Sequence, residues 1–168
     1  MDAVMVARKP CARMVAAARG AWCGLMKPLV VPGTLDSLGA IRAYVRETAQ
    51  QAGIGQDAVY DLTLAVEEFV TNAITHGYQE HGLSGDVTVS AEQNDEEFII
   101  RLEDTAPAFD PRTLAMPNEE DLAKPLEERG IGGLGVYLSV KALDRFDYER
   151  AGNRNCLTLA MNKASHAQ

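Results

Sequence analysis

The chain has 168 residues, of which 46% are hydrophobic and 24% are charged, and its formal net charge is −8 at pH 7. This length fits one compact domain better than two, and the composition is rich enough in apolar residues to exclude a disordered polymer. No stretch approaches the roughly 18 uninterrupted apolar residues that a membrane span needs. The excess of acids disfavours binding to nucleic-acid backbones, so we expect proteins or metal-chelated nucleotides as partners.

The first 27 residues differ from the rest of the chain in charge, with five bases and one acid. Arg interrupts their apolar runs, so they lack the apolar core of a secretory signal, and their resemblance to a transit peptide is faint. We expect residues 1–27 to be a disordered, basic extension and residues 28–164 to form the folded domain. The cysteines lie in no CxxC spacing, which argues against a zinc knuckle and favours a cytoplasmic location.

The remaining sequence predicts helices and strands in a clear order. Apolar residues at helical spacing indicate a helix over residues 35–53 and a second from Asp57, its expected N-cap, to about Gly77. Strands are expected at 86–92 and 98–102, then a long loop at 104–132, a helix from residue 134, and a hairpin of strands 146–150 and 156–161. Strands in hairpin pairs with helices between the pairs favour an α+β fold. We expect a two-layer α/β sandwich, with a mixed, mostly antiparallel sheet covered by helices on one face.

The first segment with chemical meaning is Glu68-Phe69-Val70-Thr71-Asn72 in the second predicted helix. The spacing of four places Glu68 and Asn72 on neighbouring turns of one face, away from the apolar stripe. A carboxylate beside a carboxamide suits a Mg²⁺ site in which Asn72 donates a carbonyl oxygen and Glu68 takes a proton from a nucleophile. From spacing alone, a solvated helix face explains the same pattern.

Two further segments follow. Asp104 leaves the end of a strand and enters a loop, where its carboxylate can accept a hydrogen bond from an exocyclic amine such as that of adenine; an ordinary polar strand end is the alternative. Residues 129–136 read Arg-Gly-Ile-Gly-Gly-Leu-Gly-Val and place four glycines at the start of a helix, where backbone N–H groups can approach a phosphate. This run matches neither the P-loop nor the Rossmann pattern, and a purely structural turn is the alternative.

In this order and spacing, residues 29–163 resemble the GHKL ATPase family, and within it the bacterial anti-sigma factor serine/threonine kinases. Residues 66–78 resemble its N box, E-x-x-x-N followed by A-x-x-H-x-Y. Asp104 with Phe109 and Asp110 resembles the first glycine box, and residues 132–135 resemble the second. Thr158 matches a family threonine near the adenine.

The resemblance implies a Bergerat-type ATP-binding fold with ATP and Mg²⁺ as cofactors. Glu68 would be the catalytic general base, Asn72 would ligate Mg²⁺, and Asp104 would bind the amine of adenine. Residues 111–131 would form a mobile lid over the phosphates. The nucleotide-binding residues that it implies are Asn72, His76, Asp104, Ala106, Arg129, Gly130, Gly132, Gly133, Leu134, Gly135 and Thr158.

The first glycine box departs from the family pattern D-x-G-x-G, because Ala106 and Ala108 stand in place of the glycines. If the backbone at Ala106 needs a positive φ, the change costs on the order of 1 kcal/mol and weakens nucleotide binding several-fold. Pro107 also removes a backbone donor. Glu68 and Asn72 are intact, which favours an active kinase.

Two classes of function stay open. As an enzyme, the chain would transfer the γ-phosphate of ATP to a serine or threonine of a small STAS-type antagonist protein, and would sequester a regulatory partner such as a sigma factor by turns. As a binding module, it would hold a partner in a nucleotide-dependent way without phosphotransfer. We expect no direct nucleic-acid or membrane partner, and the resemblance is compatible with a homodimer.

Overall fold

The computed structural model describes residues 23, 24, 26–113 and 134–167. Two short strands and a 3₁₀ turn lead into two long helices, and two antiparallel hairpins follow, with a third helix between them. The elements in chain order are β1 (Cys23–Gly24), β2 (Leu29–Pro32), η1 (Leu35–Ser37), α1 (Leu38–Gln51), α2 (Gln56–Asn72), η2 (Ala73–Gln79), β3 (Asp86–Gln93), β4 (Glu97–Asp104), η3 (Pro111–Thr113), α4 (Leu134–Lys141), β5 (Arg145–Ala151) and β6 (Arg154–Asn162).

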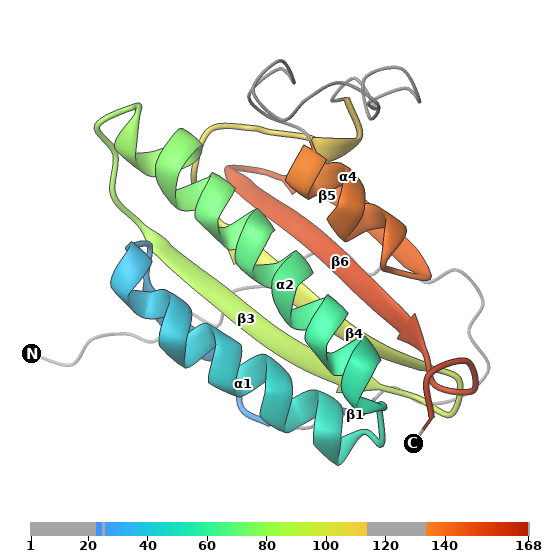
Figure 1. Ribbon diagram of the computed structural model, residues 1–168. Helices are drawn as coiled ribbons and strands as arrows, with labels where there is room; N and C mark the ends of the chain where they lie inside the picture. Colours follow the sequence, from blue (N-terminus) through green and yellow to red (C-terminus); the bar gives the residue numbers. More distant parts are fainter. Residues whose placement is uncertain (1–22, 25, 114–133, 168) are drawn as a thin grey trace, which may run out of the picture.

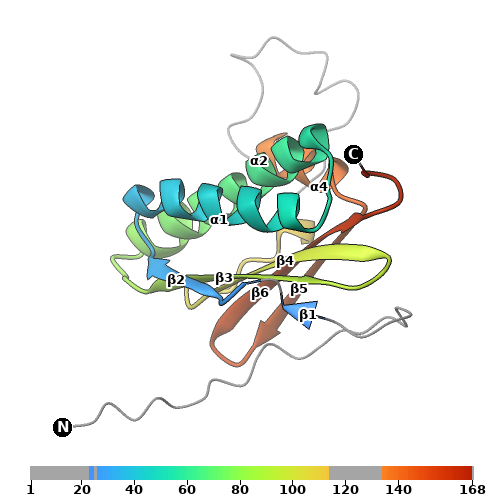
Figure 2. The ribbon, with the colours of Figure 1, turned by 90° about the horizontal axis from the view of Figure 1, so that it is seen from below.

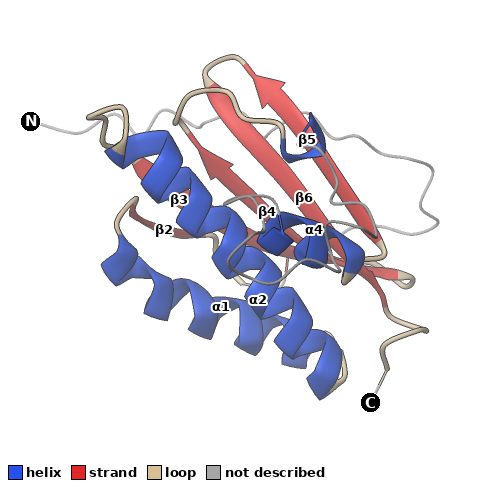
Figure 3. Ribbon diagram, turned by 45° about the horizontal axis from the view of Figure 1, so that its top comes forward, coloured by secondary structure: helices blue, strands red, loops and turns tan. Residues whose placement is uncertain are grey.

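The strands form a single sheet in the order β1-β3-β4-β6-β5, and β2 also pairs with β3. Every strand pair among the described residues is antiparallel. Helices α1, α2 and α4 lie against one face of this sheet, as Figures 1 and 2 show from two directions and Figure 3 shows by colour. The expected α+β sandwich with helices on one face is therefore confirmed.

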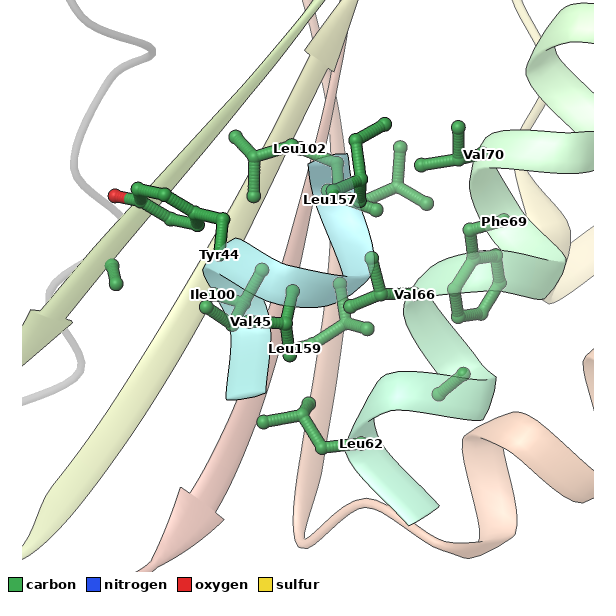
Figure 4. Packing of buried hydrophobic residues seen from close by; sticks show 14 of the residues in the cluster. Tyr44, Val45, Leu62, Val66, Phe69, Val70, Ile100, Leu102, Leu157 and Leu159 are labelled. Carbon is green, nitrogen blue, oxygen red and sulfur yellow. The ribbon is translucent and has the colours of Figure 1, made fainter. Parts of the chain in front are cut away.

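The core lies between α1, α2 and the helix-facing side of the sheet. Apolar residues three or four apart put one stripe of each helix against the sheet, and every second residue of β3, β4 and β6 points back at them. In Figure 4 the side chains of α2 meet those of β4 and β6 at close range. The fully or nearly fully buried members of this contact are Leu62, Val66, Phe69, Val70, Ile100, Leu102, Leu157 and Leu159.

Two parts of the fold differ from the sequence-based expectation. Helix α2 begins at Gln56 with Gly55 as its N-cap, so Asp57 is not the N-cap. After Asn72 the helical run continues as the π-helix η2 to Gln79, close to the predicted end near Gly77. The short strands β1 and β2 were not predicted, and Cys23 of β1, inside the expected extension, pairs with Gln93 of β3. None of the helices in the described ranges is long and apolar enough to cross a bilayer.

Neighbouring residues on β6 give a test of the layer arrangement. Leu159 is fully buried beneath the helices, whereas Thr158 points to the opposite face of the sheet and is only half-buried. We expect Leu159→Ala to lower the free energy of unfolding by about 2–5 kcal/mol, because it removes buried methyl groups and leaves a cavity. Thr158→Ala should cost under about 1 kcal/mol. Urea unfolding of both variants measures the difference, and equal losses would contradict the assigned strand faces.

Candidate functional site

A cavity of about 440 Å³ lies between the C-terminal half of α2, η2 and the neighbouring ends of β4 and β6. Five of the predicted site residues, from two separate segments of the chain, line its wall: Glu68, Asn72, His76, Asp104 and Ala106. The fold therefore brings the first two sequence segments together around one space.

The third segment is placed only in part. Leu134 and Gly135 begin α4, whose first turn lies beside α2 (Figure 1). The predicted residues Arg129, Gly130, Gly132 and Gly133, and the lid from residue 114 onward, lie outside the described residues.

Thr158 is not brought to the cavity. Its neighbours Leu157 and Leu159 are buried in the helix-facing core, so strand alternation turns Thr158 to the other face of the sheet. Asn155 and Leu157 are the described residues of β6 that line the wall, and neither was predicted as a site residue.

Glu68 and Asn72 form a hydrogen-bonded pair on the cavity wall. Asn72 Nδ2 donates to Glu68 Oε1 at 3.1 Å, as the spacing of one helical turn allows. Because a carboxylate only accepts, the amide nitrogen of Asn72 must face Glu68, and its carbonyl oxygen is left for another partner. Both residues are half-buried, so the pair is neither a core contact nor a fully solvated helix face.

Gly135 lets the first turn of α4 approach this pair. A Cβ built on Gly135 would overlap the carboxylate of Glu68, its nearest non-bonded neighbour there. Only a residue without a side chain therefore allows the carboxylate to occupy its place against the helix. The glycine run thus has a steric role toward the acid as well as its predicted role toward phosphate.

Asp104 is a buried carboxylate at the end of β4, with 6% of its surface exposed. Burial raises the pKa of its carboxyl above the ordinary value of 3.8, because desolvation disfavours the charged form. Hydrogen bonds from Asn155 Nδ2 at 2.8 Å and from the Ala106 N–H at 2.9 Å oppose this rise in pKa, as does the positive charge of Arg150.

Ala106 does not carry the backbone cost that its place in the first glycine box suggested. No described residue other than glycine has a positive φ, so alanine is unstrained at this position. Its Cβ instead packs close to η2, where a Cβ added to Gly77 would lie 2.6 Å from it. In this pair of positions, Gly77 is therefore the residue that cannot take a side chain without displacing the loop.

Two histidines line the mouth of the cavity, and one of them was not predicted. His76 Nδ1 lies 2.7 Å from Glu80 Oε1, and His81 Nδ1 lies 3.0 Å from the carbonyl oxygen of His76. Since that carbonyl only accepts, Nδ1 of His81 carries the proton, and Nε2 is the nitrogen that remains for a ligand. The sequence holds no spacing signal for His81, because the turn after η2 brings it back to the wall.

Tyr78 is hydrogen-bonded to the loop that follows Asp104. Its ring is buried, and its hydroxyl accepts a hydrogen bond from the Thr105 N–H at 2.9 Å and lies 3.2 Å from the carbonyl oxygen of Asp86. The hydroxyl thus ties η2 to the residue that directly follows Asp104.

Comparison with known proteins identifies the family. The sequence profile of the histidine kinase-like ATPase domain matches residues 31–161, a range that contains every wall residue named above. The chain belongs to this family. The predicted resemblance to GHKL-type ATPases is thereby confirmed.

Curated relatives of the chain are serine-protein kinases. The chain is 28% identical over 138 residues to the serine-protein kinase RsbW of Bacillus subtilis (strain 168). The matched region covers 79% of this chain and 81% of that protein. It is 27% identical over 136 residues to the RsbW of Halalkalibacterium halodurans, covering 80% of each. Both relatives are named serine-protein kinases, in line with the expected serine/threonine kinase type.

A solved structure confirms the fold. The crystal structure of the RsbU and RsbW domains of a Mycobacterium tuberculosis protein superposes with a TM-score of 0.52 at 20% identity. The match covers 80% of this chain and 32% of that longer chain.

The raised pKa of Asp104 leads to a pH test of its expected contact with adenine. The ionised carboxylate is the stronger acceptor for an amine, so ATP affinity should fall on acidification, and this loss should begin at a higher pH than for an aspartate of ordinary pKa. Asp104→Asn should bind ATP several-fold more weakly at neutral pH and lack this extra loss. Calorimetric titration of both proteins over a series of pH values measures the difference, in which the titration of the nucleotide phosphates cancels. Parallel pH profiles would contradict the contact.

Proposed function

We propose that this protein is an ATP-dependent serine/threonine kinase of the anti-sigma factor type. It phosphorylates a small STAS-domain antagonist protein and by turns sequesters a regulatory partner such as a sigma factor, in the cytoplasm. The observation that carries the proposal is the Glu68–Asn72 pair, held at 3.1 Å on the wall of the cavity that also contains Asp104. The curated RsbW relatives support the same activity.

The proposed catalytic step uses Glu68 as the general base. Its carboxylate takes the proton from the serine or threonine hydroxyl, the hydroxyl oxygen bonds to the γ-phosphorus of ATP, and ADP leaves. Asn72 donates to one carboxylate oxygen and Gly135 leaves no space on that side, so the acid is oriented before a substrate arrives.

The wall residues also fit Mg²⁺. The described part of the wall contains no Lys or Arg, so little protein charge there offsets the phosphates. Within the described ranges, no three His, Cys, Asp or Glu residues are grouped to hold a metal unaided. Mg²⁺ needs no such cage, since it keeps waters and phosphate oxygens as ligands. The carbonyl oxygen of Asn72 is the protein ligand that we assign, and the bound ion would neutralise phosphate charge.

The direct test is incubation with ATP, Mg²⁺ and a candidate STAS-domain protein from the same genome, followed by intact-mass measurement. A gain of one phosphoryl group supports the kinase. A nucleotide-dependent complex without a mass gain supports the alternative, a binding module without phosphotransfer.

We expect Glu68→Gln to keep ATP binding and to lower the rate of phosphotransfer by about 10²–10⁴-fold, because the amide keeps the shape and loses the base. The adjacent Glu67→Gln is the matched control. Glu67 pairs with Arg42 of α1, outside the cavity wall, so its loss should leave the rate within about twofold of the parent. Rates that fall equally in both variants would reject Glu68 as the base.

We expect Gly135→Ala to lower the rate of phosphotransfer while leaving the folding stability almost unchanged. The added methyl group must displace the flexible end of Glu68, which costs little folding energy but moves the carboxylate. We expect a rate loss of up to about 100-fold with an almost unchanged thermal midpoint. Gly39→Ala in α1 is the control, because nothing lies within 4 Å of an added Cβ there. Full activity of Gly135→Ala would show that the position of the carboxylate does not matter.

A further inference from the structure

Asp104 shares its buried site with Asn155, its direct partner across the β4–β6 ladder. Asn155 is 3% exposed, and its Nδ2 donates to Asp104 Oδ1 at 2.8 Å. The same amide nitrogen lies 3.2 Å from the carbonyl oxygens of Ala106 and Pro107. Asn155 thus joins the carboxylate to the loop that follows it.

Two donors from β5 determine which way the side-chain amide of Asn155 faces. Arg150 donates to Asn155 Oδ1 at 2.7 Å, and the hydroxyl of Tyr148 donates to the same oxygen at 2.8 Å. A guanidinium has no acceptor, so the atom that it meets must be the amide oxygen. The amide nitrogen is therefore obliged to face Asp104. Arg150 also donates to the carbonyl oxygen of Ala106 at 2.9 Å, which connects the loop to the same group.

The two hydrogen bonds to the Asp104 side chain end on the same carboxylate oxygen. Asn155 Nδ2 and the Ala106 N–H both donate to Oδ1, and neither donates to Oδ2. Because Asp104 lines the cavity, Oδ2 is the oxygen that remains for a ligand. A polar network of this kind, in which Asn155 meets donors at its oxygen and acceptors at its nitrogen, has a strong preference for one arrangement.

We propose that Tyr148, Arg150 and Asn155 form a positioning relay that gives the nucleotide site its selectivity for a 6-amino purine. The inference rests on the proposed ATP-binding function. The relay favours the ionised form of Asp104 and leaves Oδ2 toward the base. An ionised carboxylate accepts from the 6-amino group of adenine, whereas it repels the 6-keto oxygen of hypoxanthine or guanine. Without the relay, the carboxylate can rotate or take up a proton, and it then loses this discrimination.

The test compares three nucleotides that share the triphosphate and differ at purine position 6: ATP, purine riboside triphosphate, which has hydrogen there, and inosine triphosphate, which has a keto oxygen. The parent should bind ATP at least about tenfold more tightly than purine riboside triphosphate, as expected for a hydrogen bond to a charged group. Inosine triphosphate should bind more weakly still. Calorimetric titration with Mg²⁺ present gives each affinity.

Two variants remove donors from the relay. Arg150→Met should lower the affinity for ATP about tenfold and change that for purine riboside triphosphate by less than about twofold, so that the ratio approaches one. Tyr148→Phe keeps the buried ring, removes only the hydroxyl and should lower the ratio several-fold. Arg154→Met is the control from the same hairpin, because Arg154 pairs with Glu103 on the opposite face of the sheet. It should keep the parental ratio.

Each outcome has a separate meaning. The ratio of the two affinities does not depend on the fraction of folded protein, and Tyr148→Phe supplies the result if Arg150→Met fails to fold. An unchanged ratio in the relay variants, or equal losses for both nucleotides, overturns the relay. A parent that binds all three nucleotides equally also overturns the relay but leaves the proposed function standing. A parent that binds none of them refutes the proposed function itself.

Discussion

The register of β4 against β6 is the constraint on which both the core and the site depend. Three successive helix-facing pairs are apolar: Phe98 with Met161, Ile100 with Leu159, and Leu102 with Leu157. The next pair in the same register and on the same face is Asp104 with Asn155. A shift of one residue would turn the apolar set to solvent, so the hydrophobic effect maintains the register that the polar pair needs. The carboxylate thus gains its partner at no separate cost in chain ordering.

Burial of Asp104 raises the free energy of its charged form, but it would make the proposed contact with a base selective. Desolvation raises the pKa of its carboxyl, and Asn155, Arg150 and the Ala106 N–H offset the effect by favouring the charged form. A surface aspartate needs no such support but exchanges its partners with water, so it discriminates poorly between an amine and a keto group. The network therefore explains why β5 contributes Tyr148 and Arg150 to a site whose wall it does not otherwise form.

Local patterns in the sequence predicted much of the fold and the helical half of the site. Glu68, Asn72 and His76 follow one helix at four-residue intervals, so helix periodicity alone places them on one wall. The strand half depends on pairing between distant segments, which periodicity does not encode. Both faces of β6 carry apolar residues, so its alternation did not reveal that Thr158 points away from the cavity and Asn155 toward it. β2 was missed because it has four residues and ends at a proline on the edge of the sheet.

The two halves of the site come from different layers, so packing between the layers sets their separation. Phe69, next to Glu68 on α2, stacks on Phe146 of β5 with ring centroids 4.9 Å apart. At the other end of the same helical run, Gly77 of η2 receives the methyl group of Ala106, two residues after Asp104. The helix that carries Glu68 and Asn72 is therefore held against the sheet on both sides of the cavity. A π-helix after Asn72 accommodates the second contact, since its wider turn changes the direction in which the following residues face. In the proposed ATP complex, where Asp104 binds the base and Asn72 the Mg²⁺ at the phosphates, these interlayer contacts would set the distance between the base and the phosphates.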